Sequence, residues 1–280
     1  MLPRSVDYYR ATSVADAVSR LKANPDAKIL AGGHSLVPAM KLRLNSPSMV
    51  IDIANISELN YIKEIGGNIC IGAMTTHAQI ANSALIQAKL PLFSDTADVI
   101  GDVQVRNAGT IGGSMAHADP SADWAAALLA TGATIVTNER SISVENFFTG
   151  FFSTALNEGE IITEIQVPTP AAGTKMTYQK FMQPASRFAI VGCAAVVTSS
   201  GGTITGAKVA FTGVSDMAFC DAAVENALVG KADNDTTAEA AGELAAEGVE
   251  ILTDHFAAED YRKHLAKVFA KKALKVVCGR

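Results

Sequence analysis

The sequence predicts an α+β protein with three consecutive parts. Residues 1–55 and 56–170 each mix short apolar strands with helical segments, whereas residues 171–280 place strands first and Ala-rich helices after them. The clearest boundary is Pro168-Thr-Pro170 with Gly173, because Pro and Gly interrupt regular structure. A chain of 280 residues is long enough for one large or two modest domains.

The composition favours a protein with a large core and excludes several classes of partner. Apolar residues make up 49% of the chain and charged residues only 18%, so some surface is expected to be buried against other subunits. A net charge of -5 gives no electrostatic case for nucleic acid or an anionic membrane. Because the N-terminus lacks the apolar core of a signal peptide and no apolar run approaches 18 residues, we expect a cytoplasmic protein without an integral membrane segment.

Cysteine and histidine spacing argues against a metal site in this chain. None of the four cysteines lies in a C-x-x-C pair, so the chain is not expected to hold an iron–sulfur cluster of its own. The five histidines show neither H-x-x-x-H nor H-E-x-x-H spacing, and no zinc site is expected.

The first part of the chain is organised around a Gly-Gly turn. A capped helix over 13–21 and an apolar strand ending at Leu30 lead into Gly32-Gly33, and residues 39–44 can form a helix. Two residues without Cβ allow backbone N–H groups to approach a ligand closely, and the free amides at the start of the next segment suit a diphosphate. The alternative is a simple tight turn. The pattern is neither G-x-G-x-x-G nor a P-loop, which disfavours an ordinary Rossmann site.

A second turn of the same kind occurs at Thr110-Ile-Gly-Gly-Ser114, and two such turns make a cradle for a large anionic ligand more plausible. Nearby, His77 fits a helix surface or a cap beside Thr75 or Thr76. Arg106 fits either a phosphate contact or a structural role in which its side chain holds the local backbone in place (a structural pin), and we favour the structural role. Core positions are predicted for Phe147, Phe148, Phe151 and Phe152.

The last hundred residues predict three strands followed by three helices. The strands cover residues 178–181, 190–198 and 203–213, with a hairpin loop at 199–202. The helices cover residues 220–229, 237–253 and 259–277. The charged residues of the final helix are predicted to form a solvated face; they are Asp260, Arg262, Lys263, Lys267, Lys271, Lys272 and Lys275.

Three motifs resemble those of one family: Ala31-Gly-Gly-His-Ser35, Thr110-Ile-Gly-Gly-Ser114 and Ala116-His-Ala-Asp-Pro-Ser-Ala-Asp123. They are similar to the FAD-binding medium subunit of the molybdenum hydroxylase (xanthine oxidase) family, and most like the aerobic carbon monoxide dehydrogenase branch. The similarity covers nearly the whole chain. It implies a PCMH-type FAD-binding domain of two α/β subdomains, 1–55 and 56–170, followed by a C-terminal domain, 171–280, with a three-stranded antiparallel sheet and helices.

The resemblance also implies a set of FAD-binding residues. They are Ala31, Gly32, Gly33, His34, Ser35, Thr110, Ile111, Gly112, Gly113, Ser114, Asp123, Ile162, Lys180 and Phe188. Asp123 is expected to accept hydrogen bonds from ribityl or ribose hydroxyls, Ile162 and Lys180 to lie by the flavin ring, and Phe188 to screen its reactive face. From the residues alone, Asp123 also fits a helix N-cap, Phe188 a core position and Lys180 a surface charge. Ser114 stands where some relatives have Asn.

The function implied is electron output. In the family, substrate is oxidised at a molybdenum cofactor in a large subunit, and electrons cross two [2Fe–2S] clusters in a small subunit to this FAD and then to an external acceptor. The expected assembly is a dimer of heterotrimers. This chain needs no catalytic acid or base of its own, and the resemblance fixes neither the substrate nor the acceptor.

Two other functions are compatible with the fold. A free-standing FAD-dependent oxidoreductase would need an acid or base by the flavin, for which His117 is the best candidate. A scaffold that has lost its cofactor is disfavoured because the glycines and Asp123 are intact.

Overall fold

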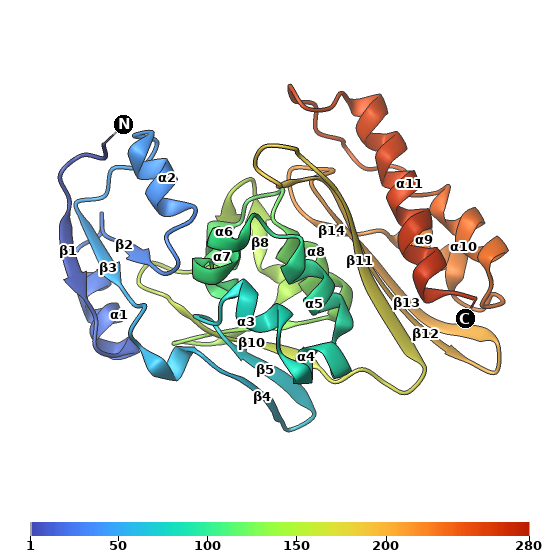
Figure 1. Ribbon diagram of the computed structural model, residues 1–280, viewed down its shortest axis with the longest axis horizontal. Coiled ribbons are helices and arrows are strands. Elements are labelled where there is room, and N and C mark those ends of the chain that lie inside the picture. The colour runs from blue at the N-terminus through green and yellow to red at the C-terminus, as the bar shows by residue number, and fades with distance from the viewer. Residues whose placement is uncertain (1, 280) are drawn as a thin grey trace.

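The structure, a computed structural model, describes residues 2–279. It has three larger β-sheets arranged in a row, each with its own helices, and a separate two-stranded hairpin (Figure 1). Within these residues, no helix is both long and apolar enough to cross a membrane.

The first unit is a small parallel sheet with two helices. Its elements are β1 (Asp7–Arg10), α1 (Val14–Ala23), β2 (Lys28–Leu30), α2 (Leu36–Lys41) and β3 (Met49–Asp52), and the strand order is β1-β3-β2. Ser13 caps α1 by accepting a hydrogen bond from the amide of Asp16. Strand β2 is an edge strand, and the loop that follows it faces the second unit (Figure 1).

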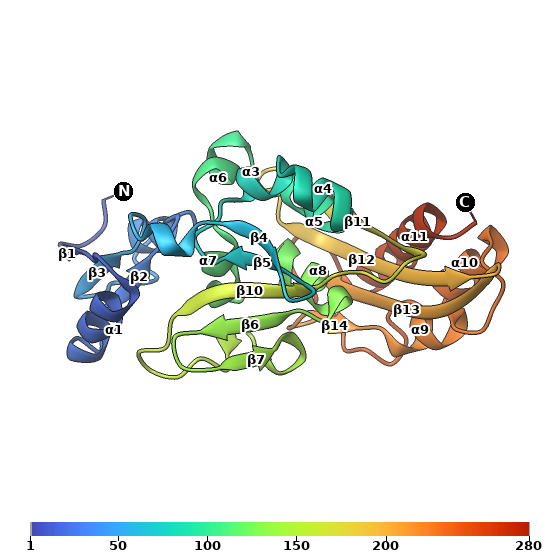
Figure 2. The same ribbon diagram turned by 90° about the horizontal axis from the view of Figure 1, so that it is seen from below.

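The second unit is an antiparallel sheet of order β4-β5-β10-β6-β7. Its strands are β4 (Ile62–Ile65), β5 (Asn68–Gly72), β6 (Thr134–Thr137), β7 (Ser141–Ser143) and β10 (Ile162–Pro168). Its helices are α3 (His77–Ala81), α4 (Ala84–Lys89), α5 (Pro91–Asp98), α6 (Val103–Ala108), α7 (Ile111–His117) and α8 (Asp123–Thr131), with single 3-10 turns at Ser57–Leu59 and Val144–Asn146. Helices α7 and α8 pack on the central strand β10 (Figure 2).

Only part of the predicted phenylalanine core is correct. Phe147 is fully buried and Phe148 packs against the same core. Phe151 and Phe152 lie at the tip of the hairpin formed by β8 (Phe148–Gly150) and β9 (Ser153–Thr154), where they are 59% and 45% exposed. A two-stranded hairpin has no layer over its tip, so that part of the prediction is wrong.

The third unit contains the three predicted strands and a short fourth one. The strands β11 (Thr174–Met182), β12 (Ala189–Ser200), β13 (Thr203–Thr212) and β14 (Phe219–Cys220) lie in that order in an antiparallel sheet. Its helices are α9 (Ala222–Leu228), α10 (Asp235–Gly242) and α11 (Glu259–Val277), so the predicted helix 237–253 is wrong beyond Gly242.

Alternation along β12 gives the third sheet two buried faces. Cys193, Ala195 and Val197 pack in the core that contains α11, whereas Ala194 packs in the core shared with α5 and α8 of the second unit. The second and third units are therefore joined by a continuous apolar core.

One charge of the final helix is not solvated as predicted. Arg262 is 2% exposed and donates to the backbone carbonyls of Ile190, Gly213 and Leu252. Gly213 and Leu252 lie outside the strands, and Ile190 lies at the bulge in the pairing of β12 with β11. A buried guanidinium supplies the donors that these carbonyls need.

A buried carboxylate joins the 137–140 turn to the loop that precedes β10. Glu160 accepts hydrogen bonds from the side chains of Thr137 (2.7 Å) and Arg140 (3.0 and 3.1 Å) and from the amide of Asn157 (2.7 Å). The next two residues lead into different cores, because Ile161 packs with the first unit and Ile162 with the second. Burial alone would raise the pKa of Glu160, but these hydrogen bonds outweigh it and hold the pKa at about 2.

We expect Glu160→Gln to destabilise the chain at pH 7 and to matter less in acid. Since the pKa falls from an ordinary 4.5 to about 2 on folding, the carboxylate contributes fully above about pH 5 and its contribution is lost as the pH falls toward 2. Urea unfolding should show a loss of roughly 2–3 kcal/mol at pH 7 that narrows at pH 3. Glu139→Gln, which removes the exposed pair with Lys22, is the control and should cost under about 1 kcal/mol. A pH-independent difference would contradict the assignment.

Candidate functional site

A cavity of about 580 Å³ lies between the first and second units, a size typical of cofactor sites. Its lining comes from Asn45, Ile53 and five stretches within residues 28–39, 73–77, 100–123, 152–162 and 186–188. The last of these belongs to the third unit, so all three units contribute to the wall.

The first Gly-Gly turn forms one side of this cavity. Gly33 has φ of +74°, a left-handed conformation that favours glycine, and its carbonyl accepts the amide of Val37 as α2 begins. Residues Ala31, Gly32, Gly33, His34 and Ser35 all line the cavity.

This loop leaves a row of amides unused. Among residues 2–279, no hydrogen-bond acceptor is found for the backbone N–H groups of Gly32, Gly33, His34, Ser35 and Leu36. Ser35 occupies the N-cap position of α2 without a side-chain capping bond, so the helix does not use its hydroxyl either. Consecutive free amides beside a hydroxyl form a concave donor set that suits a phosphate group.

The second Gly-Gly pair behaves differently from the expected open turn. Thr110 is the N-cap of α7, and its Oγ1 accepts the amide of Gly113 at 3.2 Å. The amide of Gly112 donates to the carbonyl of Ala73, and that of Ile111 to the carbonyl of Thr75. These amides are spent within the fold, so this pair cannot form the second half of a backbone cradle as predicted.

The glycines are nevertheless required, because they let backbones touch. A Cβ on Gly32 would lie 2.1 Å from the carbonyl oxygen of Ala108 and 2.7 Å from the Cα of Gly109. A Cβ on Gly112 would lie 2.6 Å from the Cβ of Ala73. The first loop thus rests directly on the backbone that leads into the second Gly pair, and the two motifs are neighbours in space.

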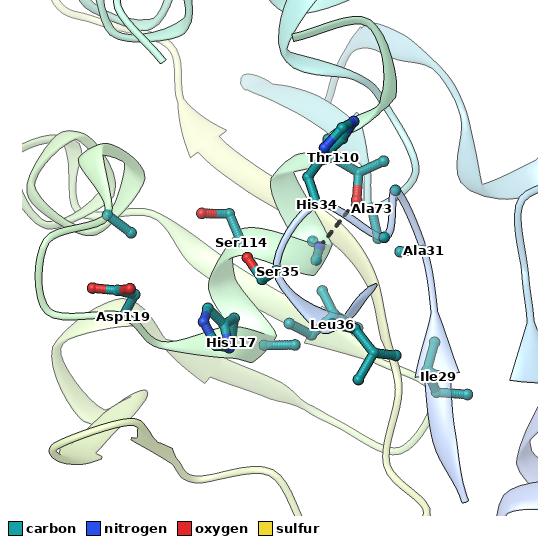
Figure 3. A pocket seen from close by; sticks show the side chains of 18 of the residues that line it. Ile29, Ala31, His34, Ser35, Leu36, Ala73, Thr110, Ser114, His117 and Asp119 are labelled. Carbon is teal, nitrogen blue, oxygen red and sulfur yellow. Dashed lines mark hydrogen bonds between the residues drawn. The ribbon is translucent and has the colours of Figure 1, made fainter. Parts of the chain in front are cut away.

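Hydroxyl and ring side chains from both motifs face the same space. Figure 3 shows Ser35 on the first loop, with Ser114 and His117 on α7, around one part of the cavity. His117 packs edge-on against Phe152, with ring centroids 5.2 Å apart. Thr110, Gly112, Gly113 and Ser114 line the cavity, whereas Ile111 is fully buried in the core of the second unit.

The loop Asp119–Ala122 connects α7 to α8 and forms part of the cavity wall. Hydrogen bonds from the third unit hold it in place. Thr212 Oγ1 donates to the carbonyls of Pro120 (2.7 Å) and Ala122 (2.9 Å), and the amide of Ala189 donates to the carbonyl of Ser121. The C-terminal unit therefore fixes the position of the segment that leads into Asp123.

Asp123 lies in the first turn of α8, lines the cavity and is 4% exposed. Its Oδ1 accepts from the Tyr178 hydroxyl (2.6 Å) and its Oδ2 from the Lys180 ammonium (2.8 Å). Burial raises the pKa of Asp123, and the Lys180 charge and the two hydrogen bonds oppose that rise. Burial and the Asp123 charge raise the pKa of Tyr178.

Lys180 lies behind the wall and is not among the lining residues. Its side chain is 1% exposed, and its ammonium also donates to the carbonyl of Val99 at 3.1 Å. The sequence-based expectation of a lysine at the flavin ring is therefore not met in this structure. Lys180 instead balances the Asp123 charge and joins β11 to the second unit.

The remaining implied residues form apolar parts of the wall. Ile162, 4% exposed, lines the cavity where β10 begins, beside a bulge in its pairing with β6. Phe188 comes from the loop between β11 and β12 and is 41% exposed. Its neighbour Arg187 has φ of +62° and donates to the carbonyl of Gly101 at 3.3 Å, which draws this loop toward the second unit.

Two further predictions concern residues near the second Gly pair. Arg106 donates to the carbonyls of Ile100 and Gly101, which confirms the structural pin. His77 is not a surface residue, because it is 4% exposed and lines the cavity. The cap of α3 is Thr76, as one of the two alternatives predicted. The burial of His77 was not predicted because its partner is distant in sequence: the indole N–H of Trp124 donates to His77 Nδ1 at 3.1 Å.

Removing one partner of the Lys180–Asp123 pair should destabilise the chain strongly. We expect Lys180→Met to lower the free energy of unfolding by about 3 kcal/mol, because a buried carboxylate loses its counter-ion. The double variant Lys180→Met/Asp123→Asn should recover part of this loss in urea unfolding. Lys208→Met removes a half-exposed cation from its pair with Glu225 and serves as the control, at under about 1 kcal/mol. If the loss of unfolding free energy in the double variant equals the sum of the losses in Lys180→Met and Asp123→Asn, the two residues are not coupled.

Comparisons with known families cover both parts of the chain. Residues 4–170 match the FAD binding domain in molybdopterin dehydrogenase, and residues 176–277 match the CO dehydrogenase flavoprotein C-terminal domain.

Individual relatives match over their whole lengths. The chain is 38% identical to the carbon monoxide dehydrogenase medium chain of Hydrogenophaga pseudoflava, covering 100% of this chain and 99% of that one. It is 36% identical to the glyceraldehyde dehydrogenase medium chain of Sulfolobus acidocaldarius, covering 99% and 100%.

Solved structures agree with these relatives. A chain of carbon monoxide dehydrogenase from Hydrogenophaga pseudoflava superposes with a TM-score of 0.95 at 40% identity over 100% of both chains. A chain of quinoline 2-oxidoreductase from Pseudomonas putida 86 gives 0.93 at 32% identity over 99% and 98%. The chain belongs to the FAD-binding medium subunits of the molybdenum hydroxylase family.

Proposed function

We propose that this chain holds one FAD in the cavity between its first two units and uses it to pass electrons from the [2Fe–2S] clusters of a small subunit to an external acceptor. The observation that carries the proposal is the row of free amides at residues 32–36, which face a cavity of the size a cofactor needs. Bound FAD supplies the capacity to take up electrons singly and release them as a pair.

Separate groups in the wall suit separate parts of FAD. The amides of the first loop, with Ser35, bind the diphosphate, because they are donors without another acceptor among the described residues. Ser114 and Asp123 hold hydroxyl groups, for which each Asp123 oxygen keeps a lone pair beyond the bond it already accepts. Ile162 and Phe188 provide apolar surface for the ring.

The proposed partners are a large molybdopterin-binding subunit and a small [2Fe–2S] subunit, assembled as a dimer of heterotrimers. Relatives named as medium chains or subunits of carbon monoxide, glyceraldehyde and nicotine enzymes support a role as one subunit among several. Within residues 2–279, no group of three His, Cys, Asp or Glu side chains is placed to hold a metal ion, so the other redox centres are assigned to the partners. A second candidate, a free-standing FAD oxidoreductase, is favoured only by His117 in the cavity wall.

Purified chain should release FAD on denaturation, and Gly32→Ala should lose most of it. The added Cβ would overlap the Ala108 carbonyl, so the loop must move and its amides leave their positions. FAD content is measured by absorbance and chromatography, with circular dichroism to check the fold. Gly206→Ala is the control, since its Cβ would lie 4.0 Å from the nearest atom. Bound FMN, a colourless wild type or full retention in Gly32→Ala would count against the site.

Electron transfer should require the partner subunits. Mixing this chain with the large and small subunits should allow substrate to reduce FAD, whereas the chain alone should reduce no acceptor with carbon monoxide, aldehydes or heterocycles. Stopped-flow absorbance of the flavin follows the reaction, and a complex lacking the small subunit is the control. Turnover by the isolated chain that is lost in His117→Ala would favour the free-standing oxidoreductase instead.

A further inference from the structure

His77 stands at the junction of the two Gly segments. It is the first residue of α3, where Thr76 and Gln79 form a reciprocal capping box, and its own amide donates to the carbonyl of Gly109 at 3.0 Å. Its side chain is 4% exposed and lines the cavity.

The tautomer of His77 follows from its partner. Trp124 Nε1 donates to Nδ1 at 3.1 Å, and an indole N–H can only donate. Nδ1 is therefore an acceptor, and in the neutral imidazole the hydrogen must lie on Nε2. Burial lowers the pKa of His77 to about 3, with His34 and Arg106 adding to the shift, so the ring is neutral near pH 7.

The Nε2–H group has no acceptor among residues 2–279. A Cβ on Gly109 would lie 2.8 Å from Nε2, so this nitrogen lies against the backbone of Gly109. The Cα of the same Gly109 would lie 2.7 Å from a Cβ added to Gly32. The unpaired donor thus lies where the first loop, with its free amides, touches the second segment.

The Nε2–H donor has no protein acceptor among the described residues and belongs to a side chain that lines the cavity, so it is available to an acceptor on a bound ligand. We propose that His77 is a neutral hydrogen-bond donor to a diphosphate oxygen of FAD, fixed in the donating tautomer by Trp124. This inference rests on the proposed function of the cavity. Arg106, the nearby cation, directs its Nη1 to the carbonyls of Ile100 and Gly101 and is not among the residues that line the cavity, whereas His77 is.

The test measures FAD binding to apoprotein by fluorescence and the ³¹P resonances of the bound diphosphate. His77→Leu removes the donor and should weaken FAD binding by about tenfold or more and shift a ³¹P resonance. His77→Gln keeps a donor near the Nε2 position and should recover part of the affinity. Thr96→Val, which removes a buried hydroxyl of α5 that does not line the cavity, is the control and should change neither quantity.

A measurement on the wild type needs no variant to fold. With ¹⁵N-labelled histidine, His77 should show hydrogen on Nε2 in the apoprotein, and FAD should shift the Nε2 resonance. Unchanged His77 and ³¹P resonances, or His77→Leu with wild-type affinity, would overturn the inference while the FAD site stands. An affinity loss without a ³¹P shift would reduce His77 to a packing role and also overturn it. Wild-type chain that binds no FAD would refute the proposed function itself.

Discussion

The contact of Gly32 with the backbone of Ala108 and Gly109 is the constraint on which the site depends. Two loops from separate units meet main chain to main chain, at a distance that no side chain allows. Other links between these units include the exposed Lys22–Glu139 pair and the side chains of Met74 and Ile161, which enter the core of the first unit. The close contact sets where the free amides of residues 32–36 point and places them beside α7 and His77.

The two Gly pairs look alike in sequence but serve different physical purposes. In the first, left-handed Gly33 opens a loop whose amides stay free. In the second, Thr110 caps α7 and the amides of Gly112 and Gly113 are consumed by Ala73 and Thr110. The second pair contributes because its residues have no side chain. This allows α7 to pack against Ala73 and the first loop to pack against α7. The first loop therefore supplies the free amides of the cradle, and the second Gly pair supports that loop.

Much of this could be predicted from local patterns. The strand before the first Gly pair, the three long strands of the C-terminal sheet and the position of Asp123 at the start of a helix all follow from periodicity and capping residues. The failures involve distant partners. His77 is buried beside Trp124, 47 residues away. Lys180 pairs with Asp123, 57 residues away, a contact that strand alternation alone does not reveal. Arg262 is buried and donates to three carbonyls from separate parts of the chain, at residues 190, 213 and 252, a set that no sequence window contains.

The most direct measurement of the central claim is amide hydrogen exchange with and without FAD. If the first loop alone supplies the backbone donors, the amides of residues 32–36 exchange quickly in the apoprotein and become protected when FAD binds. The amides of Gly112 and Gly113 are then protected in both states, because the fold already uses them. FAD-dependent protection at residues 112 and 113, with none at residues 32–36, would contradict the account.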